Sequence, residues 1–314
     1  MIAERPGEQK SKGDEGMRRI TSSPHPITSS SPLRPFTLSP RLGLTFVSIV
    51  SLLAGVMASA AFDWRAETFL LIATGALLSQ GAWAVWWHCV AGTDWAAIAT
   101  EWRSWRSGSP SLSLPPLPYT LPYTQPNTDG AKAAAVLGQF ADWAKQKLWP
   151  AHGAKVASGA AALAIAVVLS AILGGQAVLL TIVALCLPQI AAAWSKGNGQ
   201  PHPILQGISQ AALPFWLGYA LFNPMVLSVF GIGLGIGLAL GGLCAASAAP
   251  SKQSVVLHIG LGLVLFVLMM TRRPIGAFLV ALFWVPHILR LNIITRNSMW
   301  WLLASIVAAG AAVS

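Results

Sequence analysis

Acidic residues are missing from the second part of this 314-residue sequence, because no aspartate or glutamate follows Asp142. Carboxylates ligate Mg²⁺ and Na⁺, relay protons and act as general bases. The segment after Asp142 is therefore expected to work without carboxylate-based metal binding or ion coupling.

Charge of either sign is scarce as well. Charged residues make up 10% of the chain and apolar residues 54%, and the mean hydropathy is +0.61. Soluble proteins carry about 25% charged residues, so this composition indicates an integral membrane protein. The net charge of +10 is expected to face anionic membrane lipids, and no nucleic acid partner is predicted.

Cysteine is rare too, with Cys89, Cys186 and Cys244 each in or beside an apolar run. Their spacing matches neither a metal site nor a disulfide framework. We interpret them as small apolar filling residues.

The apolar runs predict an all-α fold, a polytopic transmembrane helix bundle of about nine spans. Two transmembrane helices are expected within residues 42–92 and about seven within residues 156–314. A span needs about 20 mostly apolar residues. The candidate spans are Leu42–Phe62, Thr68–Val90, Val156–Leu173, Gln176–Trp194, Ile204–Phe222, Met225–Ala248, Ser254–Thr271, Ile275–Ile294 and Met299–Val313. The short connections Gly174-Gly175 and Asn223-Pro224 predict antiparallel hairpins.

Lysines and arginines predict the orientation of the bundle. They gather in residues 1–41, a Ser- and Pro-rich tail predicted to be disordered, and again in residues 93–155. The positive-inside rule places both regions, and so the N-terminus, in the cytoplasm of a multi-pass protein of the cytoplasmic membrane. The pair Arg272-Arg273 would then lie outside, so either this pair is tolerated there or a later segment is not a full span.

The loop of residues 93–155 has two parts with different patterns. Pro115–Pro118 opens an extended, polyproline-like run. Residues Lys132–Trp149 show helical periodicity, with an apolar face and a basic face. Such a helix, leading directly into a span, favours a position on the membrane surface. The alternative is a helix packed against other parts of the loop.

Two features of the later spans bear on packing and binding. The glycines Gly231, Gly233, Gly235, Gly237 and Gly241 recur at small-xxx-small spacing, which predicts close contact between helix backbones. The second feature is a pair of residues near the cytoplasmic end of the eighth span. His287 and Arg290 share one helix face there and could bind an anionic headgroup or a diphosphate. The alternative for Arg290 is a side chain that reaches the interface for its own hydration.

The segment from Thr93 to Glu101, at the end of the second span, combines acids with tryptophans. The neighbouring tryptophans are Trp83, Trp86, Trp87, Trp95, Trp102 and Trp105. Aromatic walls beside charge could hold a ligand, although packing of the rings against one another is the ordinary reason for such a cluster.

This segment, followed by Arg103 and by Arg106-Ser107-Gly108, resembles the first motif of UbiA-type intramembrane prenyltransferases, Asn-Asp-x-x-Asp-x-x-x-Asp followed by Arg-Pro and Ser-Gly. Asp94 matches the first acid and Glu101 the third, whereas Ala97 stands at the middle acid. The second acidic motif of the family has no counterpart in residues 243–252.

The resemblance implies that Asp94 and Glu101 are catalytic and hold Mg²⁺ against a prenyl diphosphate. Arg103 and Arg106, with His287 and Arg290, would bind the substrate. The leading hypothesis is a diverged UbiA-like membrane protein that binds or transfers a polyprenyl or other lipid-like molecule, with membrane lipids as its surroundings. The alternatives are a non-catalytic scaffold or assembly protein and a transporter or flippase without carboxylate coupling.

Overall fold

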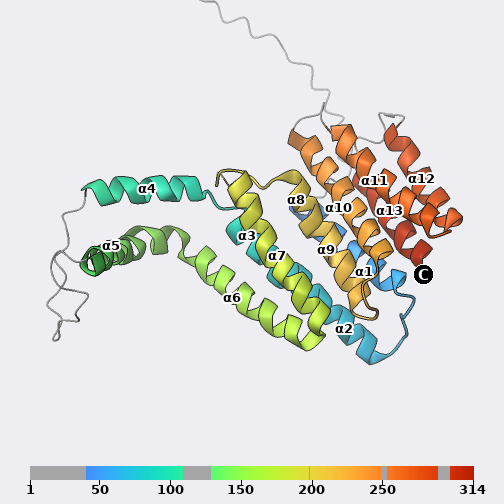
Figure 1. Cartoon of the computed structure of the whole chain (residues 1–314), viewed down its shortest axis with the longest axis horizontal. Coiled ribbons are helices and arrows are strands. Elements are labelled where there is room, and N and C mark those ends of the chain that lie inside the picture. The colour runs from blue at the N-terminus through green and yellow to red at the C-terminus, as the bar shows by residue number, and fades with distance from the viewer. Residues whose placement is uncertain (1–39, 109–128, 198, 249–252, 289–297) are drawn as a thin grey trace, which may run out of the picture. The chain divides into compact units, whose positions relative to one another are not determined.

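The computed structural model describes residues 40–108, 129–197, 199–248, 253–288 and 298–314, and within these ranges every regular element is a helix (Figure 1). The all-α prediction is therefore confirmed for the described chain. The predicted disordered tail, apart from its last two residues, and the proline-rich run lie outside these ranges.

The helices follow the predicted spans closely. In chain order they are α1 (Pro40–Ala58), α2 (Ala66–Ala76), η1 (Leu77–Trp83), α3 (Ala84–Val90), α4 (Trp95–Gly108), α5 (Asp129–Trp143), η3 (Ala144–Leu148), α6 (Trp149–Leu173), α7 (Gly175–Trp194), α8 (Pro203–Gly207), η4 (Ile208–Ala212), α9 (Leu213–Ala220), α10 (Leu227–Ala248), α11 (Gln253–Met270), α12 (Pro274–Ile288) and α13 (Ser298–Val313). The η segments are π-helical turns that continue into their neighbours, so that residues 66–90, 129–173 and 203–220 are continuous helices.

Fewer helices are long and apolar enough to cross a membrane than the sequence predicts. Within the described ranges, four helices are long and apolar enough to cross a membrane: Ala66–Val90, Asp129–Leu173, Gly175–Trp194 and Leu227–Ala245. Four others are apolar but shorter: Thr45–Ala58, Val255–Met270, Pro274–Val285 and Met299–Val313. The structure therefore supports a membrane protein with four candidate spans and does not confirm about nine.

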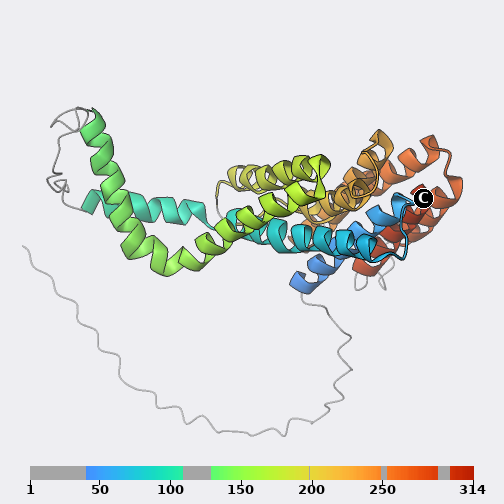
Figure 2. The same cartoon turned by 90° about the horizontal axis from the view of Figure 1, so that it is seen from below.

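The predicted hairpin at Gly174 is confirmed. Helix α6 ends at Leu173 and α7 begins at Gly175, and the two helices pack side by side (Figures 1 and 2). Gly174 has a φ of 103°, in the left-handed region that residues with a Cβ atom rarely adopt. The glycine therefore permits the sharp reversal between the two helices.

The glycines of α10 bring helix backbones together, as their spacing predicts. A Cβ atom at Gly235 would lie 2.7 Å from the carbonyl oxygen of Gly260 in α11, and one at Gly242 would lie 2.5 Å from the amide nitrogen of Leu257. On its other side, Gly241 approaches Ile204 of α8. Helix α10 therefore packs tightly between α11 and α8.

Helices α4 and α5 pack against each other through aromatic rings. Trp102 of α4 lies 5.4 Å from Phe140 and 5.4 Å from Trp143 of α5, measured between ring centroids. Trp143 is buried, whereas Leu137 of α5 is 67% exposed. The predicted helix at Lys132–Trp149 thus exists, and one of its faces packs against α4, another part of the same loop. Its contact with the membrane surface stays a prediction.

Candidate functional site

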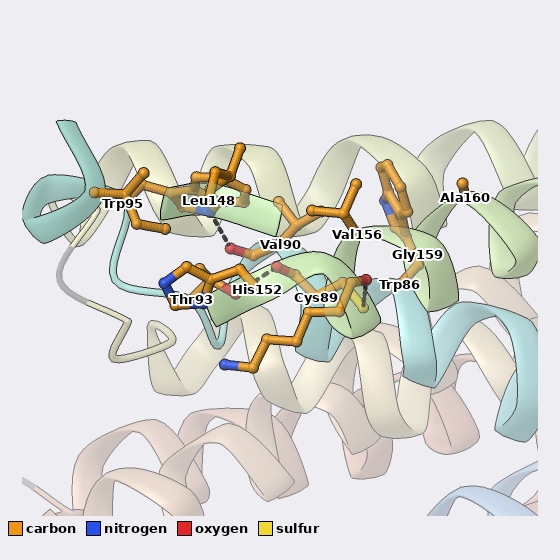
Figure 3. A pocket seen from close by; sticks show the side chains of 12 residues that line it. Trp86, Cys89, Val90, Thr93, Trp95, Leu148, His152, Val156, Gly159 and Ala160 are labelled. Carbon is orange, nitrogen blue, oxygen red and sulfur yellow. Dashed lines mark hydrogen bonds between the residues drawn. The ribbon is translucent and has the colours of Figure 1, made fainter. Parts of the chain in front are cut away.

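A pocket of about 210 Å³ lies where the end of α3, the start of α4 and the start of α6 meet (Figure 3). Its walls are largely apolar and include Trp86, Val90, Trp95, Ile98, Leu148 and Val156. Its polar lining comes from Cys89, Thr93, His152 and Lys155. Figure 3 shows Trp95 at one end of the group of side chains and Trp86 toward the other, near Gly159 and Ala160. An apolar pocket with a few polar groups is typical of a small-molecule site.

The wall formed by α3 is held by hydrogen bonds that leave its apolar surfaces facing the pocket. The indole Nε1 of Trp86 donates to the carbonyl oxygen of Leu185 in α7, at 3.1 Å. The Cys89 thiol donates to the carbonyl oxygen of Lys155, at 3.2 Å. Gly159 of α6 sits against Cys89, and a Cβ atom there would lie 3.3 Å from the Cβ of Cys89. The small residue therefore lets α6 approach α3 and form the pocket.

The wall formed by α4 is held in place at the first turn of that helix. Asp94 Oδ1 accepts a hydrogen bond from the backbone N–H of Ala97, at 2.9 Å, which is the bond that an N-cap aspartate makes. Trp95 folds back, and its Nε1 donates to the carbonyl oxygen of Val90, at 2.7 Å. The N–H of Ala96 donates to the carbonyl oxygen of Gly197, at 3.0 Å. These bonds fix the side of the pocket that Trp95 and Ile98 form.

The two acids of the predicted catalytic pair lie beside this pocket but do not line it. The carboxylate of Asp94 caps α4, and Glu101 is exposed on the same helix. Seven residues of α-helix correspond to a rise of about 10.5 Å, whereas Mg²⁺ binds its ligands at about 2.1 Å. The two carboxylates are thus too far apart along the helix to share one ion readily. Within the described ranges, no group of three His, Cys, Asp or Glu side chains could hold a metal, so these residues do not fit the Mg²⁺ that the resemblance implies.

Of the other predicted substrate-binding residues, the structure places three, on the two helices α4 and α12. Arg103 is exposed on α4, and Arg106 lies near the end of that helix with its side chain outside the described part. His287 belongs to α12, again without a described side chain, and Arg290 lies outside the described residues. Helix α4 packs on α5, whereas α12 packs on α11 and α13. The helices that carry Arg103 and His287 therefore have different neighbours.

The tryptophan cluster of the sequence separates into three environments. Trp83 and Trp87 are buried, and Nε1 of Trp83 donates to the Thr181 hydroxyl of α7, at 3.3 Å. Trp86 and Trp95 line the pocket. Trp102 packs against α5 as described above, and its ring also stacks on that of Trp105. The expected aromatic walls are thus present, but only two of these tryptophans provide them.

The cationic side of the pocket was missed by sequence reasoning, which interpreted Lys155 only as a topology signal. His152 and Lys155 are three residues apart in α6, so they lie on one helix face. The signal that could have identified them is this spacing directly before the apolar run that begins at Val156.

Comparison with protein-family models, with curated proteins and with solved structures finds no match for this chain. The chemistry of the pocket therefore has to be inferred from its own residues. The resemblance to UbiA-type prenyltransferases remains a hypothesis that rests on half of the motif around Asp94 and on the predicted span count and orientation.

Proposed function

We propose that this protein binds the hydrocarbon chain of a lipid-like molecule, such as a polyprenyl lipid, in the pocket between α3, α4 and α6. The observation that carries the proposal is the apolar lining of that pocket, from Trp95 at one end to Trp86 toward the other. Apolar walls favour a hydrocarbon chain, because burial of such a chain removes apolar surface from water. The resemblance to prenyltransferases supports a prenyl chain.

Two observations on α6 favour a position of the pocket in the membrane, which suits a lipid-like ligand. Helix α6 exposes Val167, Val168 and Ile172, an apolar surface suited to lipid tails. Trp149, which is 60% exposed, precedes the apolar run of α6, and tryptophan is enriched at membrane interfaces. The pocket would then open at the level where lipid headgroups meet the hydrocarbon core.

The finer topology is part of the same proposal. The four shorter apolar helices and the continuous helix of residues 203–220 would join the four long ones in a bundle of about nine spans in the cytoplasmic membrane, with the N-terminus in the cytoplasm. The support is the distribution of lysine and arginine in the chain, together with the packing of α11 and α13 on α10, of α12 on α11 and α13, and of α1 on α9 and α13. A reporter fused after Ser314 tests the span count, because nine spans place that residue outside.

Photochemical labelling of the purified full-length protein tests the pocket. A long-chain alcohol carrying a diazirine near the end of its chain should label peptides from α3 and α6. Val156→Trp should abolish this label, because the larger side chain fills the pocket. Val168→Trp, on an exposed position of the same helix outside the pocket lining, is the matched control. Equal labelling of both variants would contradict the proposal.

The part played by the two acids needs its own test. Asp94→Asn removes the charge but keeps a side chain that can cap the helix. Glu101→Gln removes the charge from an exposed position of the same helix. Unchanged binding of a prenyl probe by both variants would show that these acids are not part of the site. A loss in Asp94→Asn without loss of helix α4 would support the prenyltransferase resemblance.

A transporter or flippase is the second candidate, and the π-helical turns favour it. Such turns are frequent at functional sites. The π-helical turns η1 and η4 lie inside the helices of residues 66–90 and 203–220. Gln80 in η1 has an amide nitrogen that is buried without a hydrogen-bond partner among the described residues, and Gln210 in η4 is buried. Movement of a fluorescent lipid between leaflets of proteoliposomes tests this candidate, and Gln80→Ala should slow it. A rate equal to that of protein-free vesicles would exclude it for that lipid.

A further inference from the structure

The polar lining of the pocket carries positive charge without a matching acid. Lys155 and His152 both line the pocket, and no aspartate or glutamate is among its lining residues. Lys155 is exposed and His152 is half-buried. A bound group that meets this lining is therefore favoured when it is anionic.

The remaining polar groups of the pocket already have partners within the protein. The Thr93 hydroxyl donates to the carbonyl oxygen of Cys89, at 2.7 Å, and the indole N–H groups of Trp86 and Trp95 donate to backbone carbonyls. By contrast, the side chains of Lys155 and His152 form neither an ion pair nor a hydrogen bond with any residue that the structure describes. They are the lining groups left to bind a ligand.

The size and position of the pocket limit what it encloses. Pockets that enclose a whole drug-sized ligand measure about 300–1,000 Å³, which exceeds the 210 Å³ found here. Lys155 directly precedes the apolar residue Val156. The pocket therefore suits the junction of an amphiphile, where an anionic headgroup meets the first part of its chain.

From these observations we infer that the pocket selects a single-chain amphiphile with a phosphate monoester headgroup, held by Lys155 and His152. A phosphate group offers three strong acceptor oxygens and a charge of about −1.5 to −2 at neutral pH. The Lys155 ammonium supplies three donors and the imidazole of His152 supplies at least one. This inference rests on the proposed lipid-binding function and adds the headgroup class. It requires no metal ion.

Competition against the diazirine alcohol, with full-length protein, tests the inference. The competitors are dodecyl phosphate, dodecanol and inorganic phosphate. Dodecyl phosphate should compete about tenfold better than dodecanol, the order expected for one or two charge-assisted hydrogen bonds at a partly exposed site. Inorganic phosphate should compete far more weakly, because it has no chain. Competition by inorganic phosphate at the same concentration would overturn the assignment to an amphiphile.

Charge-removing variants separate the headgroup from the pocket. Lys155→Gln should remove most of the roughly tenfold advantage of dodecyl phosphate and leave competition by dodecanol unchanged. Lys147→Gln removes the same charge from an exposed position of the same continuous helix, outside the pocket lining, and should have no effect. Gel filtration checks that each variant stays folded.

The possible failures can be told apart. Equal competition by dodecyl phosphate and dodecanol, unchanged in Lys155→Gln, would overturn the phosphate inference and leave the lipid pocket standing. No labelling of α3 and α6 by the alcohol probe would instead overturn the proposed function itself.

Discussion

A methyl group added at Gly260 should force α10 and α11 apart. The Cβ atom of an alanine there would lie 2.5 Å from the amide nitrogen of Ala239 and 2.5 Å from the carbonyl oxygen of Gly235. Ordinary contact begins at 3.4 Å. Both neighbouring atoms belong to the backbone of α10, so no side-chain rotation can relieve the overlap.

The magnitude follows from this geometry. Overpacking of a well-packed core costs about 1–3 kcal/mol. Replacing glycine by alanine inside a helix gives back about 1 kcal/mol through helix propensity. Gly138→Ala in α5 isolates the second effect, because a Cβ atom there would meet nothing within 4 Å. We therefore expect Gly260→Ala to be less stable than Gly138→Ala by about 2 kcal/mol.

Unfolding of the purified protein by SDS in mixed micelles, followed by tryptophan fluorescence, measures this difference. Gly235→Ala should cost a similar amount, and the double variant should cost less than the sum, because both methyl groups separate the same pair of helices. Equal stability of Gly260→Ala and Gly138→Ala would refute the close contact between α10 and α11.

Three further predictions concern contacts of the single side chains Asp94, Asp63 and Trp102. Asp94→Ala should speed amide hydrogen exchange in the first turn of α4 by removing a cap worth about 1 kcal/mol, while Asp94→Asn should retain most of the protection; equal exchange in both would argue against the cap. The Thr68 hydroxyl, which donates to the carboxylate, holds the pKa of Asp63 below its ordinary value of 3.8, so the ionised form is favoured in the folded state. The wild type should therefore be more stable than Asp63→Asn above pH 3.8, and this difference should disappear as the pH falls through the lowered pKa. A difference in thermal midpoint between the two proteins that persists at lower pH would contradict this. Trp102→Ala removes two ring contacts with α5 worth about 0.5–1.5 kcal/mol each, so α5 amides should exchange faster, and unchanged exchange would count against the contact.

The helices could largely be predicted from the sequence, because long apolar runs and glycine leave few alternatives. The predicted fourth span, Gln176–Trp194, differs from α7 by one residue at its start. The first prediction runs too far, to Phe62, whereas α1 ends at Ala58. The chain leaves the helix here because Ala60 has a φ of 54°, the left-handed conformation that commonly follows a helix end.

Which helices meet could not be predicted, because glycine spacing indicates close packing without naming a partner. The sequence pattern of α10 does not reveal that Gly242 faces Leu257 while Gly241 faces Ile204. The π-helical turns are equally hidden, since their residues have no distinctive composition.

The pocket lies beside the segment that the sequence singled out, but Asp94 and Glu101 are not among its lining residues. The acids around Asp94 drew attention to the end of the second helix, where the pocket lies. An acid one residue before a helix is, however, also the ordinary N-cap pattern, and the structure shows Asp94 in that position. The spacing of His152 and Lys155 predicts a shared helix face, but their position in a pocket could not be predicted, because only tertiary packing brings α6 against α3.

The most direct test of a lipid-binding pocket is mass spectrometry of the lipids that co-purify with the full-length protein in mild detergent. The wild type and Val168→Trp should both retain the same prenyl or acyl-chain phosphate, at close to one molecule per chain, and Val156→Trp should have lost it. The same lipid composition in all three proteins, with bulk phospholipid alone, would contradict the proposed function.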